Sequence, residues 1–115
     1  MTEFSFAGVS VSSSGREYFQ VLFQDDPDSD SNYFVIQRQF ESYDGGLFYV
    51  ETDQPTLCGH FRIKWAQLGK DRLRFELASQ PIETVQISFE ADTARYNQLR
   101  RVLKIMIPSR KLKIE

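Results

Sequence analysis

The sequence contains one cysteine, Cys58, and one histidine, His60. A single cysteine cannot form an internal disulfide, and these two side chains alone cannot supply the ligands of a structural zinc site. Side chains two positions apart on a strand point the same way, so Cys58 could act as a nucleophile with His60 as its base. No third residue in the sequence is marked as a group that would orient the histidine. Chance proximity is the better interpretation, and we expect no catalytic residue, metal or cofactor here.

Long apolar runs are also missing. The first residues, Met1–Phe6, contain neither a basic segment nor an apolar stretch, which argues against a signal peptide. No run approaches the ~20 apolar residues that a membrane-spanning helix needs. Together with the lack of disulfides, these absences predict a cytoplasmic protein that does not contact a membrane.

The known catalytic motifs are absent too. The sequence has no glycine-rich phosphate loop that opens a helix, no His-Glu-x-x-His and no nucleophile elbow. Asp26, Asp28 and Asp30 have the spacing of calcium ligands, but Ser31 and Gln37 stand where an EF-hand loop needs glycine and glutamate. A solvated loop is the better interpretation, and the sequence as a whole predicts a binding protein and not an enzyme.

The composition instead suits one packed domain. The 115 residues include ten Phe, five Tyr and one Trp, and the hydrophobic fraction is 41%. A chain of this size buries roughly two-thirds of its unfolded surface, which allows a core without disulfides. We expect a single domain over residues 1–115.

Short alternating runs separated by turn residues extend from about residue 4 to residue 90. They predict an antiparallel sheet of about seven strands. The clearest run is His60–Leu68, in which apolar and polar residues alternate. The bulky aromatics on the apolar phase are expected in the core: Phe19, Phe61, Trp65, Phe75 and Phe89.

The period changes near the C-terminal end. Asp92 is a good N-cap, and apolar residues then recur at helical spacing until Pro108. We predict a helix over residues 93–106, packed on an apolar face of the sheet, and a short edge strand over residues 110–114. The fold class is therefore α+β, mostly β. An unpaired edge invites strand addition, so a homodimer is conceivable.

Charge is distributed unevenly along the chain. Residues 1–60 have two basic and ten acidic side chains, a net charge of −8, whereas residues 61–115 have twelve basic and six acidic ones, a net charge of +6. If the halves do not neutralise each other, each offers a surface to a charged partner. The acidic candidates, with a neighbouring tyrosine, are Asp25, Asp26, Asp28, Asp30, Glu41, Tyr43 and Asp44. The basic candidates are Arg95, Arg100, Arg101, Lys104, Arg110, Lys111 and Lys113.

Several runs in the middle of the chain resemble a known family. They are Tyr33–Arg38 (YFVIQR), Phe48–Glu51 (FYVE), Asp53–Gln54, Cys58–His60 (CGH) and Asp71–Leu77 (DRLRFEL). In this order they are similar to the tenth of the immunity-protein families named from bacterial polymorphic toxin systems. The resemblance covers roughly residues 18–107.

The resemblance implies a small bacterial protein of the cytoplasm that binds a cognate protein toxin, often a nuclease, and neutralises it by stoichiometric inhibition. The acidic candidates would then meet the basic active site of the toxin. Two alternatives stay open. The basic candidates could follow a phosphate backbone in a nucleic-acid-binding or regulatory module, or could simply form a solvated helix face. A small ligand could also bind between sheet and helix.

Overall fold

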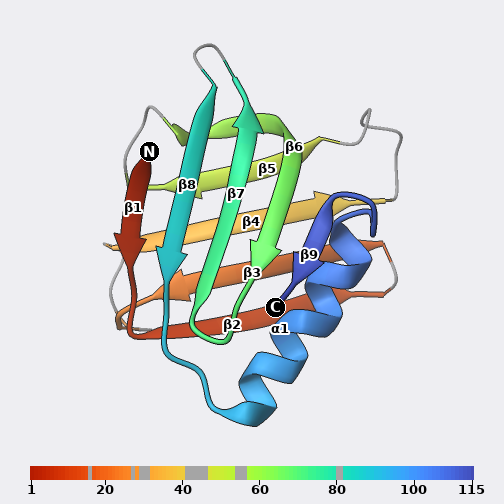
Figure 1. Ribbon diagram of the computed structural model, residues 1–115. Helices are drawn as coiled ribbons and strands as arrows, with labels where there is room; N and C mark the ends of the chain where they lie inside the picture. Colours follow the sequence, from red (N-terminus) through yellow and green to blue (C-terminus); the bar gives the residue numbers. More distant parts are fainter. Residues whose placement is uncertain (16, 27, 29–31, 41–46, 54–56, 80–81) are drawn as a thin grey trace.

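The computed structural model describes residues 1–15, 17–26, 28, 32–40, 47–53, 57–79 and 82–115. It consists mainly of β-strands, with one helix near the C-terminal end (Figure 1). The strands are β1 (Thr2–Ser5), β2 (Gly8–Ser14), β3 (Tyr18–Gln24), β4 (Tyr33–Gln39), β5 (Phe48–Thr52), β6 (Gly59–Leu68), β7 (Arg72–Ala78), β8 (Glu83–Ser88) and β9 (Leu112–Ile114), and the helix is α1 (Thr93–Met106).

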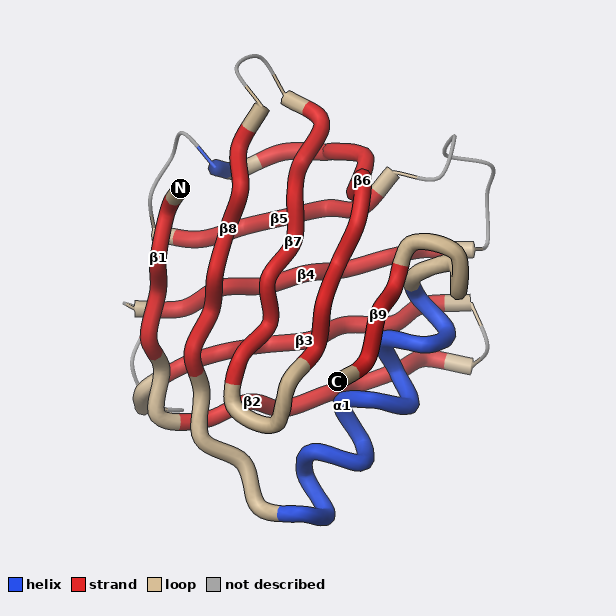
Figure 2. The backbone as a smooth tube through the Cα atoms, viewed as in Figure 1, coloured by secondary structure: helices blue, strands red, loops and turns tan. Residues whose placement is uncertain are grey.

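The strands form two crossed layers that share β6 (Figure 2). Hydrogen bonds run in the order β1-β8-β7-β6-β5-β4-β3-β2, and β9 lies beside β6. The first residues of β6 pair with β5, and the rest of the strand pairs with β7. We call β1, β8, β7, β6 and β9 the front layer, and β2 to β5 the back layer.

The predicted mostly-β fold with one C-terminal helix is confirmed, and the helix has the predicted bounds. Among the described residues, however, the sheet has nine strands where about seven were predicted. Two of the strand pairings, β1 with β8 and β6 with β9, are parallel and not antiparallel. The run that begins at Phe4 is split because the chain leaves the front layer after β1 and enters the back layer as β2.

The core lies between the two layers and is rich in aromatic rings. Phe34 of the back layer meets Phe75 of the front layer edge to face, with 6.0 Å between ring centroids. Phe23 lies 5.5 Å from Phe89, which follows β8. All four rings are buried. Aromatic pairs at these separations add to the stabilisation that apolar burial provides, so these contacts join the two layers.

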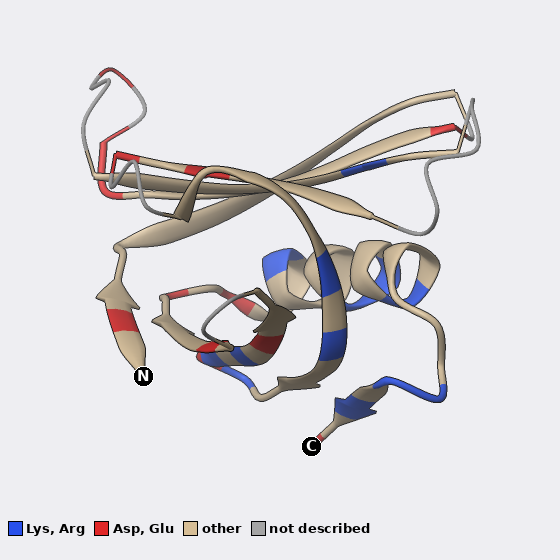
Figure 3. Cartoon of the chain, turned by 90° about the horizontal axis from the view of Figure 1, so that it is seen from above, with Lys and Arg blue, Asp and Glu red and all other residues tan. Residues whose placement is uncertain are grey.

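Helix α1 lies on the same side of the back layer as the front layer does (Figure 3). Its N-cap is Asp92, whose carboxylate accepts a hydrogen bond from the backbone N–H of Arg95 at 2.7 Å. Leu99, Leu103 and Met106 are fully buried and contribute to the core. The apolar stripe of the helix therefore packs inward, and the opposite side of the back layer is left without a covering element among the described residues.

The prediction that Trp65 lies in the core is wrong. The pairing of β6 with β7 shifts between Ile63 and Trp65, which marks a β-bulge. A bulge adds one residue to a strand and reverses which face the following side chains occupy. Ile63 and Ala66 are thus both buried, whereas Trp65 is half-buried on the outer face. The other predicted core aromatics are buried, except that Phe61 packs half-buried against the core.

Candidate protein-binding surface

The described aspartates of the predicted acidic surface gather at one end of the back layer. Asp25, Asp26 and Asp28 follow β3. Asp53, which was not among the predicted residues, follows β5, and all four are exposed. The backbone N–H of Asn32 donates to Oδ2 of Asp53 at 3.3 Å and ties the two segments together. We call these four aspartates the acidic tip.

The carboxylates of Asp25 and Asp26 are also held by backbone groups. The N–H of Ala7 donates to Oδ1 of Asp25, and the N–H of Asp28 donates to Oδ1 of Asp26, each at 2.9 Å. Within the described ranges, no ion pair joins the tip to a lysine or arginine. The negative charge there is therefore turned to solvent, where it can attract a basic partner.

The remaining predicted residues of the acidic surface, Asp30, Glu41, Tyr43 and Asp44, lie outside the described residues. The described residues on either side of positions 41–46 are Phe40 and Leu47. They lie at the opposite end of β4 from the tip, because Tyr33 pairs with Gln24 while Gln39 pairs with Tyr18. Seven residues of strand span roughly 20 Å. Phe40 and Leu47, which flank the predicted residues Glu41, Tyr43 and Asp44, are thus well separated from the acidic tip.

Between these two ends, the outer face of the back layer presents polar and aromatic side chains. The strand register places Gln20, Gln37, Tyr49 and His60 in one row across β3, β4, β5 and β6. On the same face, Tyr18 precedes Gln20 by two residues, and Tyr33 lies near the acidic tip. We call the surface formed by Tyr18, Tyr33, Tyr49, Glu51 and His60 the tyrosine face.

Glu51 organises the tyrosine face. Its Oε1 accepts a hydrogen bond from the hydroxyl of Tyr49 at 2.7 Å, and its Oε2 accepts one from the hydroxyl of Tyr33 at 3.0 Å. The ring of Tyr49 in turn lies 5.2 Å from that of His60. The hydrogen bond to Glu51, and then burial and the negative charge of Glu51, raise the pKa of both phenols above the ordinary value. Both hydroxyls therefore stay protonated as donors.

The far end of the tyrosine face has its own hydrogen bonds. Oε1 of Gln20 accepts from the Tyr18 hydroxyl at 2.7 Å and from Nε2 of Gln37 at 2.8 Å. Burial raises the pKa of Tyr18. Because its side chains are held by one another, the face is ordered before any partner arrives. Sequence reasoning missed it, although the polar phase of these strands, with its recurring tyrosines, was a visible signal.

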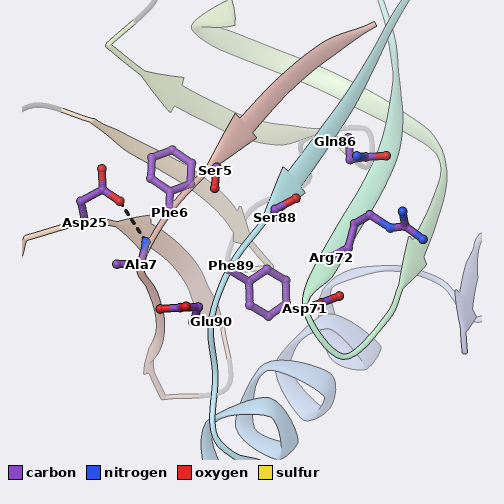
Figure 4. Close-up of a pocket in the computed structure, with 10 residues that line it drawn as sticks. All are labelled: Ser5, Phe6, Ala7, Asp25, Asp71, Arg72, Gln86, Ser88, Phe89 and Glu90. Carbon is purple, nitrogen blue, oxygen red and sulfur yellow. Dashed lines mark hydrogen bonds between the residues drawn. The ribbon is translucent and has the colours of Figure 1, made fainter.

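A separate hollow of about 470 Å³ lies beside the acidic tip, where the two layers meet (Figure 4). Asp25, Asp71, Arg72 and Glu90 line it, and buried Phe89 forms part of its wall. Its charge is mixed, with three carboxylates and one guanidinium. Serine hydroxyls also line it, but the only histidine of the chain lies on the tyrosine face, so no serine–histidine pair forms there.

The two side chains considered as a nucleophile and base, Cys58 and His60, contact different residues. The thiol of Cys58 donates to the carbonyl oxygen of Thr52 at 3.2 Å, while His60 packs against Tyr49. Among the described residues, no group of three or more histidine, cysteine or acidic side chains could hold a metal ion. No helix within those residues is long and apolar enough to cross a membrane.

The structure divides the predicted basic candidates into two groups. Arg95, Arg100, Arg101 and Lys104 are exposed on α1, and the last three line a shallow depression of about 580 Å³. Arg110, Lys111 and Lys113 follow the helix and line a second, smaller groove beside β6. The edge strand expected over residues 110–114 is present as β9, which pairs with β6.

The fold and this surface describe a small, mostly-β domain with one sheet face that is open, tyrosine-bearing and edged by acidic residues. Comparisons of the chain with protein-family models, with curated proteins and with solved structures find no match in any of the three.

Proposed function

We propose that this protein is a cytoplasmic bacterial immunity protein that binds a cognate toxin and neutralises it by stoichiometric inhibition. The proposal starts from the resemblance of several sequence runs to the tenth immunity-protein family, which no matching family model accompanies. The observation that carries the proposal is the tyrosine face with the acidic tip at its edge. A binding function needs no catalytic group, which suits a surface built from tyrosines, glutamines and carboxylates.

The tyrosine face has the chemistry of a protein interface. Tyrosine is enriched at interfaces because it offers a large contact area with a polar end and has few rotatable bonds to immobilise. Glu51 already fixes Tyr33 and Tyr49, so less side-chain entropy is lost on binding. Tyr49 lies in the middle of the face, between Gln37 and His60, where interface residues contribute most to affinity.

The acidic tip favours a basic target, and a nuclease is the class of toxin that fits best. A nuclease active site attracts a phosphate backbone with basic side chains, and carboxylates in a row can occupy the same place. Complementary charge mainly speeds association, whereas the buried centre of an interface sets the rate of dissociation. The tip and the face therefore have separable kinetic effects.

The proposal predicts that a neighbouring gene encodes a toxin domain, and the test uses the full chain with that domain. Tyr49→Ala should weaken binding at least about 30-fold, mainly through faster dissociation, because central interface tyrosines contribute about 2 kcal/mol or more. The triple variant Asp25→Asn, Asp26→Asn, Asp28→Asn should slow association roughly 10-fold at low salt and much less at high salt. Both changes should reduce protection of cells that express the toxin.

The matched control for charge is the triple variant Glu3→Gln, Glu17→Gln, Glu115→Gln, whose three residues are also exposed and lie outside both the tip and the hollow beside it. It removes the same charge and should leave the association rate nearly unchanged. If Tyr49→Ala and the aspartate variant both bind and protect as the wild-type protein does, the proposed surface is wrong. If no toxin domain is bound at all, the proposed function itself fails.

A further inference from the structure

Trp65 lies on the outer face of the front layer because of the bulge in β6. Its indole Nε1–H donates to Oε2 of Glu76 on β7 at 2.7 Å, which fixes the orientation of the ring. The guanidinium carbon of Arg74 lies 5.9 Å from the ring centroid. The indole is half-buried. A large aromatic ring is thus held in place at the surface with a cation beside it. Packing in the core does not explain why a tryptophan occupies this position.

A groove of about 310 Å³ opens beside this ring, between β6 and the segment that leads into β9. Arg110, Lys111 and Lys113 line one side, and Trp65 and Gln67 line the other. The backbone N–H of Ala66 donates to the carbonyl oxygen of Lys111 at 2.8 Å, and Lys113 pairs with Gln67. These backbone contacts hold the cationic segment against the strand that carries the tryptophan.

The groove has an excess of positive charge. Four cations, Arg74, Arg110, Lys111 and Lys113, lie in or next to it. Two carboxylates are close, and both already accept hydrogen bonds: Glu76 from Trp65 and Glu115 from Gln67. The acidic tip belongs to the back layer, so it does not cancel this charge locally.

We propose that this groove binds single-stranded nucleic acid, with one base stacked on Trp65 and the adjoining phosphates against Arg110, Lys111 and Lys113. An aromatic ring beside a row of cations is the arrangement with which proteins bind single strands, because stacking accepts any base and cations neutralise the backbone. An acidic peptide would use the cations but has no general need for the indole. The proposal is independent of toxin binding, which uses the opposite layer.

Intrinsic tryptophan fluorescence of the full chain reports on this site, because Trp65 is its only tryptophan. Titration with a ten-nucleotide oligothymidylate or oligouridylate at low salt should quench the intrinsic fluorescence. Neutralising about three phosphates predicts a slope near −2 for log affinity against log salt. Trp65→Ala, followed by the anisotropy of a labelled oligonucleotide, should weaken binding about 5- to 150-fold, the range that corresponds to about 1–3 kcal/mol for loss of one stacked base.

Two triple variants provide the matched comparison. The first variant combines Arg110→Gln, Lys111→Gln and Lys113→Gln in the groove, and it should abolish binding together with its salt dependence. The second variant combines Arg95→Gln, Arg100→Gln and Arg101→Gln on α1, and it should leave the affinity and its salt dependence unchanged. Circular dichroism of each variant separates loss of binding from loss of fold. Equal binding of heparin without fluorescence quenching would mean a general polyanion surface and would overturn the proposal, as would absence of oligonucleotide binding at low salt. Equal losses in the two triple variants would also overturn it.

Discussion

Arg38 on β4 donates a hydrogen bond from its guanidinium group to the carbonyl oxygen of Met106, the last residue of α1. The last carbonyls of a helix have no donor within the helix, and their partial negative charge attracts a cation. The guanidinium carbon also lies 4.6 Å from the ring centroid of Phe40 and 4.9 Å from that of Phe48. One side chain of the back layer therefore anchors the end of the helix.

Replacement of Arg38 by methionine should lower the free energy of unfolding by roughly 2 kcal/mol, because a charge-assisted hydrogen bond and two cation–π contacts are lost. Nε of Arg38 is buried without a hydrogen-bond partner among the described residues. Burial of an unpaired N–H is unfavourable, so its removal in the methionine variant offsets part of the decrease in the free energy of unfolding. Urea denaturation measures the change. Lys70→Met, at an exposed turn, is the control and should have little effect. An unchanged midpoint for Arg38→Met would contradict the anchoring role.

The N-terminal end of the same helix depends on Asp92, which accepts a hydrogen bond from the N–H of Arg95. Asp92→Ala should cost about 1 kcal/mol of stability, as loss of a helix N-cap usually does. Asp92→Asn keeps an acceptor and should retain most of that stability. Thermal denaturation of both variants distinguishes them. Equal losses would show that the negative charge at the helix terminus, and not the cap hydrogen bond, is what matters.

Glu51 should control the ionisation of its two tyrosines. In Glu51→Gln the pKa values of Tyr33 and Tyr49 should fall toward the ordinary value, because a neutral amide no longer favours the protonated phenols. The pKa of Tyr18, which burial raises, should stay the same and serves as the internal control. NMR titration of tyrosines labelled at the ring carbon that bears the hydroxyl resolves the three groups.

The same pKa shifts determine how stability depends on alkaline pH. A pKa raised in the folded state means that the protonated phenol stabilises the fold. This stabilisation is fully present below the unfolded-state pKa of about 10 and is lost as the pH rises through the folded-state values. Stability above pH ~10 should therefore fall less steeply in Glu51→Gln than in the wild-type protein. A steeper fall would reverse the assigned role of Glu51.

Much of the fold could be predicted from local patterns. The alternation in Arg72–Ala78 and the helical spacing after Asp92 are both properties of neighbouring residues, and both elements form as expected. The phase change in β6 was also present in the sequence, since Phe61 and Ile63 are odd-numbered whereas Ala66 and Leu68 are even-numbered. It identifies the bulge only when the buried face of the strand is known.

The candidate surface was less predictable because it depends on which strands become neighbours. Asp25 and Asp53 are 28 positions apart in the chain, yet the hydrogen bond from Asn32 joins their segments at one end of the back layer. The cluster of Tyr33, Tyr49 and Glu51 requires the register between β4 and β5. Composition alone could predict an acidic N-terminal half, but not the side of the molecule on which its charge would lie.

Local patterns account for the mostly-β class, the C-terminal helix and most of the aromatic core, because periodicity and capping act between residues a few positions apart. The outward position of Trp65, and the shared open face of the tyrosines beside the acidic tip, follow from the three-dimensional fold. Strand register and layer crossing are set by packing between distant segments, and the phase change in β6 acquires its meaning as a bulge only when that packing shows which face of the strand is buried.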